Sequence, residues 1–274
     1  MSRKMFKYGA YAFAILWGIT TLFPLAITLL SSFKDNNGIY LSMFSLPKEW
    51  IWQNYTDAFT VAKIGRGILN SIFIAIISTA LTIVIGMFTA YILSRKKFKY
   101  KSLIYLLFVV GVMIPVHCTI IPISSLSTIL NGKNTYWFII LVYVAFGLSQ
   151  AVFLFTGYLD GIDKEIDEAA IIDGCNDFQL LFRILYPVSI PIISTEAILA
   201  FIAGYGELIF SMILFTDESK YTVARSMLAF SGGYQQRLGP IFACIIIAVL
   251  PMLVLYIFFH EKVQAGMMAG SIKG

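Results

Sequence analysis

Near its middle the chain reads Asp163-Lys-Glu-Ile-Asp-Glu-Ala-Ala-Ile-Ile-Asp173, a run of good helix formers. Acidic residues fill its first turn, where the helix dipole favours negative charge. Gly174 follows, and glycine suits the left-handed residue that ends a helix. Asn176 or Asp177 can cap a second short helix, whose apolar residues recur at helical spacing until Pro187 breaks the run. These residues predict a helix–turn–helix elbow.

The composition around this elbow is that of a membrane protein. The chain has 274 residues, of which 59% are hydrophobic and 13% are charged. A soluble domain carries about a quarter charged residues, so lipid is the expected main solvent. The net charge of +5 does not indicate nucleic-acid binding. Two histidines and three widely separated cysteines predict neither a metal site nor a disulfide framework.

Apolar stretches long enough to cross a bilayer flank the elbow on both sides. A spanning helix needs about 20 apolar residues. We therefore expect an all-α membrane protein with one transmembrane domain over residues 1–274. The first stretch is longer than the apolar region of a signal peptide, so we interpret it as a retained anchor. The six predicted spans, with the elbow as loop 160–187, cover about 9–31, 68–93, 103–125, 136–157, 188–214 and 239–259.

The basic residues predict the orientation. Loop 94–102, between the second and third predicted spans, contains five basic residues and no acidic one. Short loops rich in Lys and Arg stay in the cytoplasm. With six spans, both termini and loop 160–187 then face the cytoplasm, whereas segments 34–66 and 217–237 lie outside.

The charge of the elbow bears on what it contacts. An amphipathic connector lying on lipid headgroups is one interpretation, but such helices normally present Lys and Arg to anionic lipid. The first helix of the elbow is mostly acidic. In addition, Ala169 and Ala170 are small enough to let a partner approach closely. A protein partner therefore fits this helix better than lipid does.

The elbow resembles a known motif. Its residues Glu168-Ala169-Ala170, then Gly174, then Ile184-Leu185-Tyr186-Pro187 closely follow the EAA loop of binding-protein-dependent ABC importer permeases, which prefer Leu at the position of Tyr186. In that family the loop is a coupling helix that sits in a groove of the ATPase subunit. The resemblance implies this ATPase-coupling role for Glu168, Ala169, Ala170, Asp173, Gly174 and Pro187.

Nearly the whole chain is similar to the smaller membrane subunit of maltose-type carbohydrate importers. Asn70-Ser71, the run Ala90–Arg95 and the glycine-rich tail Ala265–Gly274 carry this likeness. Tyr205-Gly206-Glu207 departs from it, because that branch often has Trp-Asn before the acid. The resemblance implies the type I ABC importer permease fold and a bacterial or archaeal cell membrane. It also implies partners: ATPase subunits, a second homologous permease, an extracytoplasmic solute-binding protein and a sugar.

Two acidic residues interrupt the fifth predicted span. Glu196 and Glu207 are expected to face the bundle interior or water, since lipid contact is costly for a carboxylate. Both are candidates for lining the solute path. For Glu207, near the predicted outer end of the span, reaching the membrane interface is the alternative.

Other functions are less well supported by the residues. No Walker A pattern occurs, so any ATP is expected to bind a partner ATPase, and no cofactor is expected on this chain. No constellation of catalytic residues indicates an enzyme. A permease of the same superfamily for a non-sugar solute, such as a glycerol phosphodiester, is the alternative. An ion-coupled secondary transporter is less favoured, because no internal repeat is visible.

Overall fold

The computed structural model describes the backbone of residues 2–232 and 236–271, and the side chains of residues 6–232 and 236–258. The described residues form helices and connecting loops, without a strand. The chain divides into two compact units. Unit 1 comprises Met1–Gly65 with Arg225–Pro251, and unit 2 comprises Arg66–Ala224 with Met252–Gly274.

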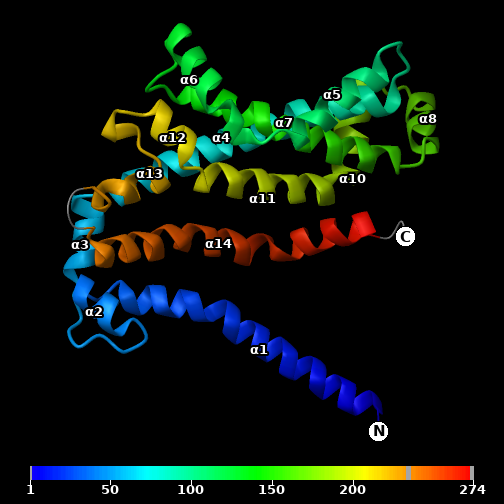
Figure 1. The fold of residues 1–274 in the computed structure, drawn as a ribbon. Helices are drawn as coiled ribbons and strands as arrows, with labels where there is room; N and C mark the ends of the chain where they lie inside the picture. Colours follow the sequence, from blue (N-terminus) through cyan, green and yellow to red (C-terminus); the bar gives the residue numbers. More distant parts are fainter. Residues whose placement is uncertain (1, 233–235, 272–274) are drawn as a thin grey trace. The chain divides into compact units, whose positions relative to one another are not determined.

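Unit 1 is organised around the end of its first helix. Its elements are α1 (Ser2–Ser31), α2 (Asn36–Ser42), α3 (Gln53–Thr60), η4 (Leu228–Phe230) and the first part of α14 (Leu238–Ser271) (Figure 1). Asn54 of α3 donates to the carbonyl oxygens of Ser32, at 2.9 Å, and Lys34, at 3.0 Å. A Cβ at Gly239, at the start of α14, would collide with that Lys34 oxygen, so only glycine fits there. The side-chain amide of Asn54 thus joins α3 to the residues that follow α1.

Unit 2 carries the elbow and the helices around it. The chain segments that build it are α4 (Ile64–Arg95, which begins in unit 1), α5 (Lys101–Met113), η1 (Val116–Thr119), α6 (Ile120–Ile129), α7 (Tyr136–Asp160), α8 (Glu165–Ile172), α9 (Asp177–Gln179), η2 (Leu180–Leu185), α10 (Tyr186–Val188), α11 (Ile190–Gly206), α12 (Ile209–Leu214), η3 (Glu218–Lys220) and α13 (Val223–Met227, which ends in unit 1). Both α5 and α11 pack against α7, and α6 packs against α12 (Figure 1).

Among the described residues, four helices are long and apolar enough to cross a membrane by themselves. They are Phe6–Ser31, Ile64–Arg95, Tyr136–Asp160 and Leu238–Phe258. Two bent pairs raise the number to as many as six if each pair is one span: Lys101–Met113 with Val116–Ile129, and Asp177–Val188 with Ile190–Gly206. The predicted spans 9–31, 68–93, 136–157 and 239–259 therefore coincide with single helices.

The predicted span 103–125 is not one straight helix in the structure. The chain bends there by 97° between α5 and the helices that follow. Ile114 has an extended backbone (ψ 122°) and Pro115 follows it. A proline ring disfavours the helical conformation of the residue before it, which explains why α5 ends at Met113.

The predicted break at Pro187 is also wrong, by two residues. The chain passes Pro187 within α10 and breaks at Ser189, where the helices on either side make an angle of 78°. Before the proline, η2 is a π-helix, and the N–H of Tyr186 donates to the carbonyl of Leu181 five residues back. The wider turn makes room for a proline ring that would clash with the preceding turn of an α-helix. The predicted span 188–214 is divided again between α11 and α12, at Glu207 and Leu208.

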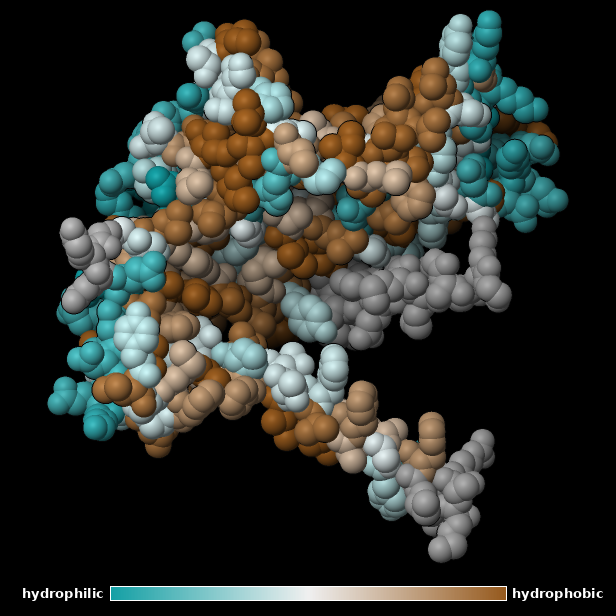
Figure 2. Space-filling model, in the orientation of Figure 1, coloured by the Kyte–Doolittle hydropathy of each residue, from teal (hydrophilic) through white to brown (hydrophobic). Residues whose placement is uncertain are grey.

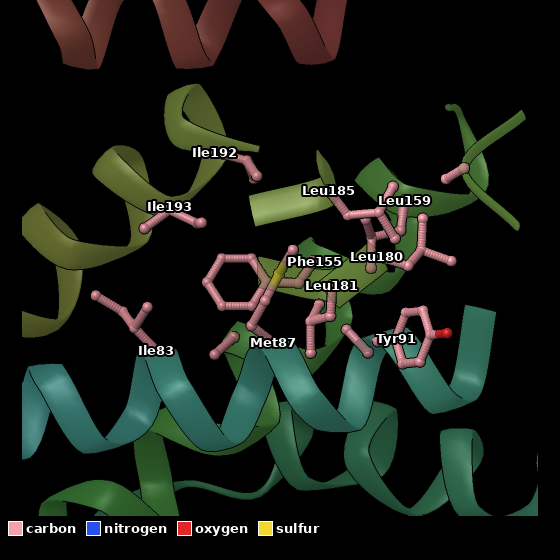
Figure 3. Packing of buried hydrophobic residues seen from close by; sticks show 13 residues of the cluster. Ile83, Met87, Tyr91, Phe155, Leu159, Leu180, Leu181, Leu185, Ile192 and Ile193 are labelled. Atoms are coloured by element: carbon pink, nitrogen blue, oxygen red, sulfur yellow. The ribbon is translucent and has the colours of Figure 1, made fainter. Parts of the chain in front are cut away.

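The elbow rests on a continuous apolar cluster of unit 2. Figure 3 shows Met87 of α4 and Phe155 of α7 lying between the other members of this cluster. The labelled side chains come from α4 (Ile83, Met87, Tyr91), α7 (Phe155, Leu159), η2 (Leu180, Leu181, Leu185) and α11 (Ile192, Ile193). Because four elements share one core, η2, in the second half of the elbow, is fixed to α4, α7 and α11.

The contact between α4 and α7 depends on a glycine, which leads to a stability prediction. A Cβ at Gly86 would lie 2.9 Å from Ala151 Cβ, whereas one at Gly157 of α7 meets nothing within 4 Å. Both Gly→Ala changes add helix propensity, but only Gly86→Ala overpacks the contact, at about 1–3 kcal/mol. We expect Gly86→Ala to unfold at a lower temperature than Gly157→Ala in detergent. Equal midpoints would contradict the close approach of α4 and α7.

Candidate functional site

The first helix of the elbow presents one face outward and one inward. On the outward face of α8 and the turn after it lie Glu168, Ala169, Ile172, Asp173 and Gly174, with Ile172 86% exposed. The inward residues are Asp167 and Ala170. The expectation that Ala170 lets a partner approach is wrong, because this residue is 3% exposed and packs in the core of its own unit. Ala169 alone of the two keeps that role.

The turn of the elbow has the predicted local structure. Gly174 has φ +84°, and the N–H of Cys175 donates to the carbonyl of Ala170 at 3.0 Å. A Cβ at Gly174 would meet no atom within 4 Å, so the positive φ is the reason for glycine. Asn176 caps α9 in a reciprocal capping box with Gln179, at 2.9 Å in both directions. The left-handed glycine is therefore confirmed, and of the two candidate caps Asn176 is the one used.

A buried arginine joins α8 to the ends of α4 and α7. Arg95 Nε lies 2.5 Å from Asp167 Oδ2, and the two side chains are 5% and 12% exposed. Nη1 of Arg95 donates to the carbonyl of Leu159 at 2.8 Å and Nη2 to that of Ile162 at 3.2 Å. From the sequence, Arg95 was expected to act first as a topology determinant in the basic loop 94–102, with any contact to the ATPase secondary. Asp167 and Ala170, three residues apart, share one face of α8, and this is the face that is buried.

A second, exposed group of contacts holds the other helix of the elbow. Lys96 Nζ donates to both carboxylate oxygens of Asp177 at 2.7 Å, and the hydroxyl of Tyr91 donates to Oδ1 at 2.9 Å. The bond from Lys96 and then that from Tyr91 hold the pKa of Asp177 below its ordinary value. A lowered pKa in the folded state means that this stabilisation is present at neutral pH and is lost as the pH falls through that pKa.

Hydrophilic residues surround this end of unit 2. Figure 2 shows them over α8 and over the loop that precedes α5. Within that polar surface Ile171, Ile172 and Phe178 are exposed large apolar side chains. An exposed apolar group rimmed by charge is typical of a protein-binding surface. Pro187 is also exposed, one helix further along.

A cavity of about 340 Å³ lies elsewhere in unit 2. Glu196 and Glu207 both line it, together with side chains of α4, α7 and α12. Glu196 is 1% exposed and accepts one hydrogen bond, at 3.3 Å, from Gln150. The structure thus brings together the two acidic residues that the sequence singled out, although they are eleven residues apart.

Glu207 caps the helix that follows the break. Its two carboxylate oxygens accept from the N–H groups of Ile209, Phe210 and Ser211, at distances between 2.7 and 3.2 Å. The hydroxyl of Tyr143 donates to Oε2 at 2.9 Å. The negative charge lies where unpaired N–H groups and the helix dipole favour it. Glu207 is therefore directed into unit 2.

Comparison with known proteins identifies the family. A family model described as the binding-protein-dependent transport system inner membrane component matches residues 82–267. The matched segment is more than half of the chain and contains the elbow and most of the cavity. The chain belongs to this family.

Full-length relatives of this permease have similar lengths. It is 31% identical over 274 residues to the diacetylchitobiose uptake system permease protein NgcG of Streptomyces coelicolor. This alignment covers 99% of this chain and 91% of that protein. The maltodextrin transport system permease protein MalD of Streptococcus pneumoniae is 27% identical, with 100% of this chain and 98% of that protein covered. The relatives are transport subunits, so the expectation that the chain is not an enzyme is confirmed.

A solved structure shows the same fold. It is a crystal structure of a bacterial ABC transporter involved in the import of the acidic polysaccharide alginate. One of its chains matches with a TM-score of 0.79 at 17% identity, over 95% of this permease and 97% of that chain. The predicted fold class, an all-α membrane permease with the type I ABC importer fold, is confirmed. The tail Ala265–Gly274 cannot be compared, since its last three residues and all its side chains lie outside the described residues.

The buried Arg95–Asp167 pair gives a prediction with an internal control. Removing one partner of a buried ion pair leaves the other charge unpaired and costs about 3–5 kcal/mol. We expect Arg95→Met and Asp167→Leu each to lower the thermal unfolding midpoint strongly, and the double variant to lose much less than the two losses added together.

The exposed Lys96–Asp177 pair of the same loop is the control. Its side chains are 45% and 63% exposed, so Lys96→Met should have little effect. Simple addition of the two Arg95 and Asp167 effects would show that the buried residues act independently.

Proposed function

We propose that this permease forms half of the solute path of an ATP-driven importer for a sugar or oligosaccharide. The observation that carries the proposal is the outward face of α8, acidic and apolar, at the end of a loop that is fixed to three long helices. The names of the relatives, which concern diacetylchitobiose and maltodextrin, support a carbohydrate as solute. A solute-binding protein delivers the carbohydrate, and a second, related permease completes the path.

In the proposed mechanism the elbow acts as a lever on the membrane helices. Two ATPase subunits, which bind the ATP, grip α8 on the cytoplasmic side of the membrane. When they close, α8 moves, and Arg95 carries the displacement to α4 and α7. Along the chain, η2 and α10 carry it to α11. In this arrangement both termini face the cytoplasm, and segment 217–237 faces the binding protein. Glu196 and Glu207 lie along the path.

Gly174 tests the lever. A β-branched residue strongly disfavours a positive φ, with a strain of roughly 1–3 kcal/mol, whereas asparagine tolerates it. Two asparagines of this chain, Asn131 and Asn134, already have φ near +55°. We expect Gly174→Val to reduce both ATPase binding and ATP-dependent uptake, and Gly174→Asn to keep most of each.

The uptake measurement needs the complete transporter. It is obtained by affinity purification of this chain in mild detergent, with mass identification of an ATPase, a second permease and a binding protein. Recovery of the chain alone, with uptake that is insensitive to ATP depletion, would refute the importer. Full activity of Gly174→Val would refute the role of the elbow.

A further inference from the structure

The cavity of unit 2 contains two carboxylates that differ in what they still can bind. At about 340 Å³ it falls within the range of small-molecule sites. Its lining includes Glu196 and Glu207 but no Lys, Arg or His from the described residues. Apolar walls from Tyr143, Phe146 and Phe210 complete it. The cavity therefore combines aromatic surface with two carboxyl groups that no basic side chain in its described wall pairs with.

The acceptor capacity of Glu207 is already used. Both of its oxygens accept backbone N–H groups of α12, and one also accepts the hydroxyl of Tyr143. A carboxylate offers about four lone-pair sites, so five short contacts leave little for a ligand. Glu207 consequently stabilises the start of α12, which forms part of the cavity wall.

Glu196 is in the opposite situation. It is buried to 1% exposure in α11, a helix of the predicted fifth span, yet it accepts one long hydrogen bond, from Gln150. A buried carboxylate with so few donors is costly, and such residues in spans mark substrate or ion pathways. A solute that donated hydroxyl hydrogens to Glu196 would offset that cost.

A second buried polar group supports the same position independently. Thr79 of α4 is 7% exposed, and its hydroxyl has no hydrogen-bond partner among the described residues. It lines the same cavity as Glu196. Buried hydroxyls are normally paired, so an unpaired one in a cavity wall indicates a missing polar ligand.

We infer that Glu196 and Thr79 form a binding subsite within this subunit for an uncharged, hydroxyl-bearing group of the solute. The subsite rests on the proposed function, since it lies on the path that the importer requires. Hydroxyls donate to Glu196 and pair with Thr79, while the aromatic walls contact the apolar faces of the ring. An anionic solute is rejected, because its charge would face Glu196 in a medium of low dielectric constant. The glycerol phosphodiester alternative is thereby disfavoured.

The test uses the complete transporter in proteoliposomes, with maltotriose and diacetylchitobiose as neutral probes. Uptake per ATP hydrolysed is measured for Glu196→Gln and Thr79→Val. We expect Glu196→Gln to lower it about tenfold and Thr79→Val about fivefold, as for the loss of one charged and one neutral hydrogen bond. Thr156→Val is the matched control: Thr156 is also buried with an unpaired hydroxyl, but it does not line the cavity.

An oxidised probe tests the charge selection. Maltotrionate, which carries a carboxylate in place of the reducing end, is compared with maltotriose in each variant. The ratio of anionic to neutral uptake should be about tenfold higher in Glu196→Gln than in the unaltered transporter. Because both transporters use the same binding protein, its own preference does not affect this comparison. Unchanged uptake per ATP in both Glu196→Gln and Thr79→Val, or an unchanged ratio, overturns the subsite alone. Absence of ATP-dependent uptake of either saccharide by the unaltered transporter overturns the proposed function as well.

Discussion

The arrangement of unit 2 depends on one buried guanidinium. Arg95 ends α4, pairs with Asp167 of α8 and donates to carbonyl oxygens at the end of α7. Helix ends leave carbonyl groups without partners, and a buried charge needs several of them. One side chain meets both requirements, so three helix ends are fixed at one point. The acidic, exposed face of α8 can then contact another protein while its inward face stays part of the permease core.

The same rule of satisfied polar groups explains the two acidic residues in the fifth predicted span. The chain breaks between α11 and α12, and the break frees backbone N–H groups that lipid cannot satisfy. Glu207 accepts them, and its charge is matched by the start of α12. Among the described residues no such compensation surrounds Glu196, whose hydrogen-bond partner there is the neutral Gln150. Two glutamates of the same predicted span thus differ in what they bind. Glu207 accepts the free backbone N–H groups of α12, whereas the oxygens of Glu196 stay available to a ligand in the cavity.

Local rules allowed much of the elbow to be predicted from sequence. The left-handed Gly174 and the cap at Asn176 depend on neighbours within a few residues, and both are present. Features that depend on distant residues were missed. Ala170 faces its own core because Arg95 holds the neighbouring Asp167 inward, and the break falls at Ser189 because a π-helix accommodates Pro187. Hydropathy located the apolar stretch 103–125 but could not show that the chain bends by 97° within it, since both halves remain apolar.

The elbow and the cavity share the same supports. Thr79 lies on α4, Glu196 on α11, and Gln150, the hydrogen-bond partner of Glu196, on α7, so three helices carry these polar groups. The elbow is bound to the first two helices through Arg95 and continues into the third through η2 and α10. In the proposed mechanism a displacement of α8 is therefore transmitted to all three helices that line the cavity. A solute held between Glu196 and Thr79 would lose its hydrogen bonds when those walls separate, which is how a lever outside the bilayer can release a ligand within it.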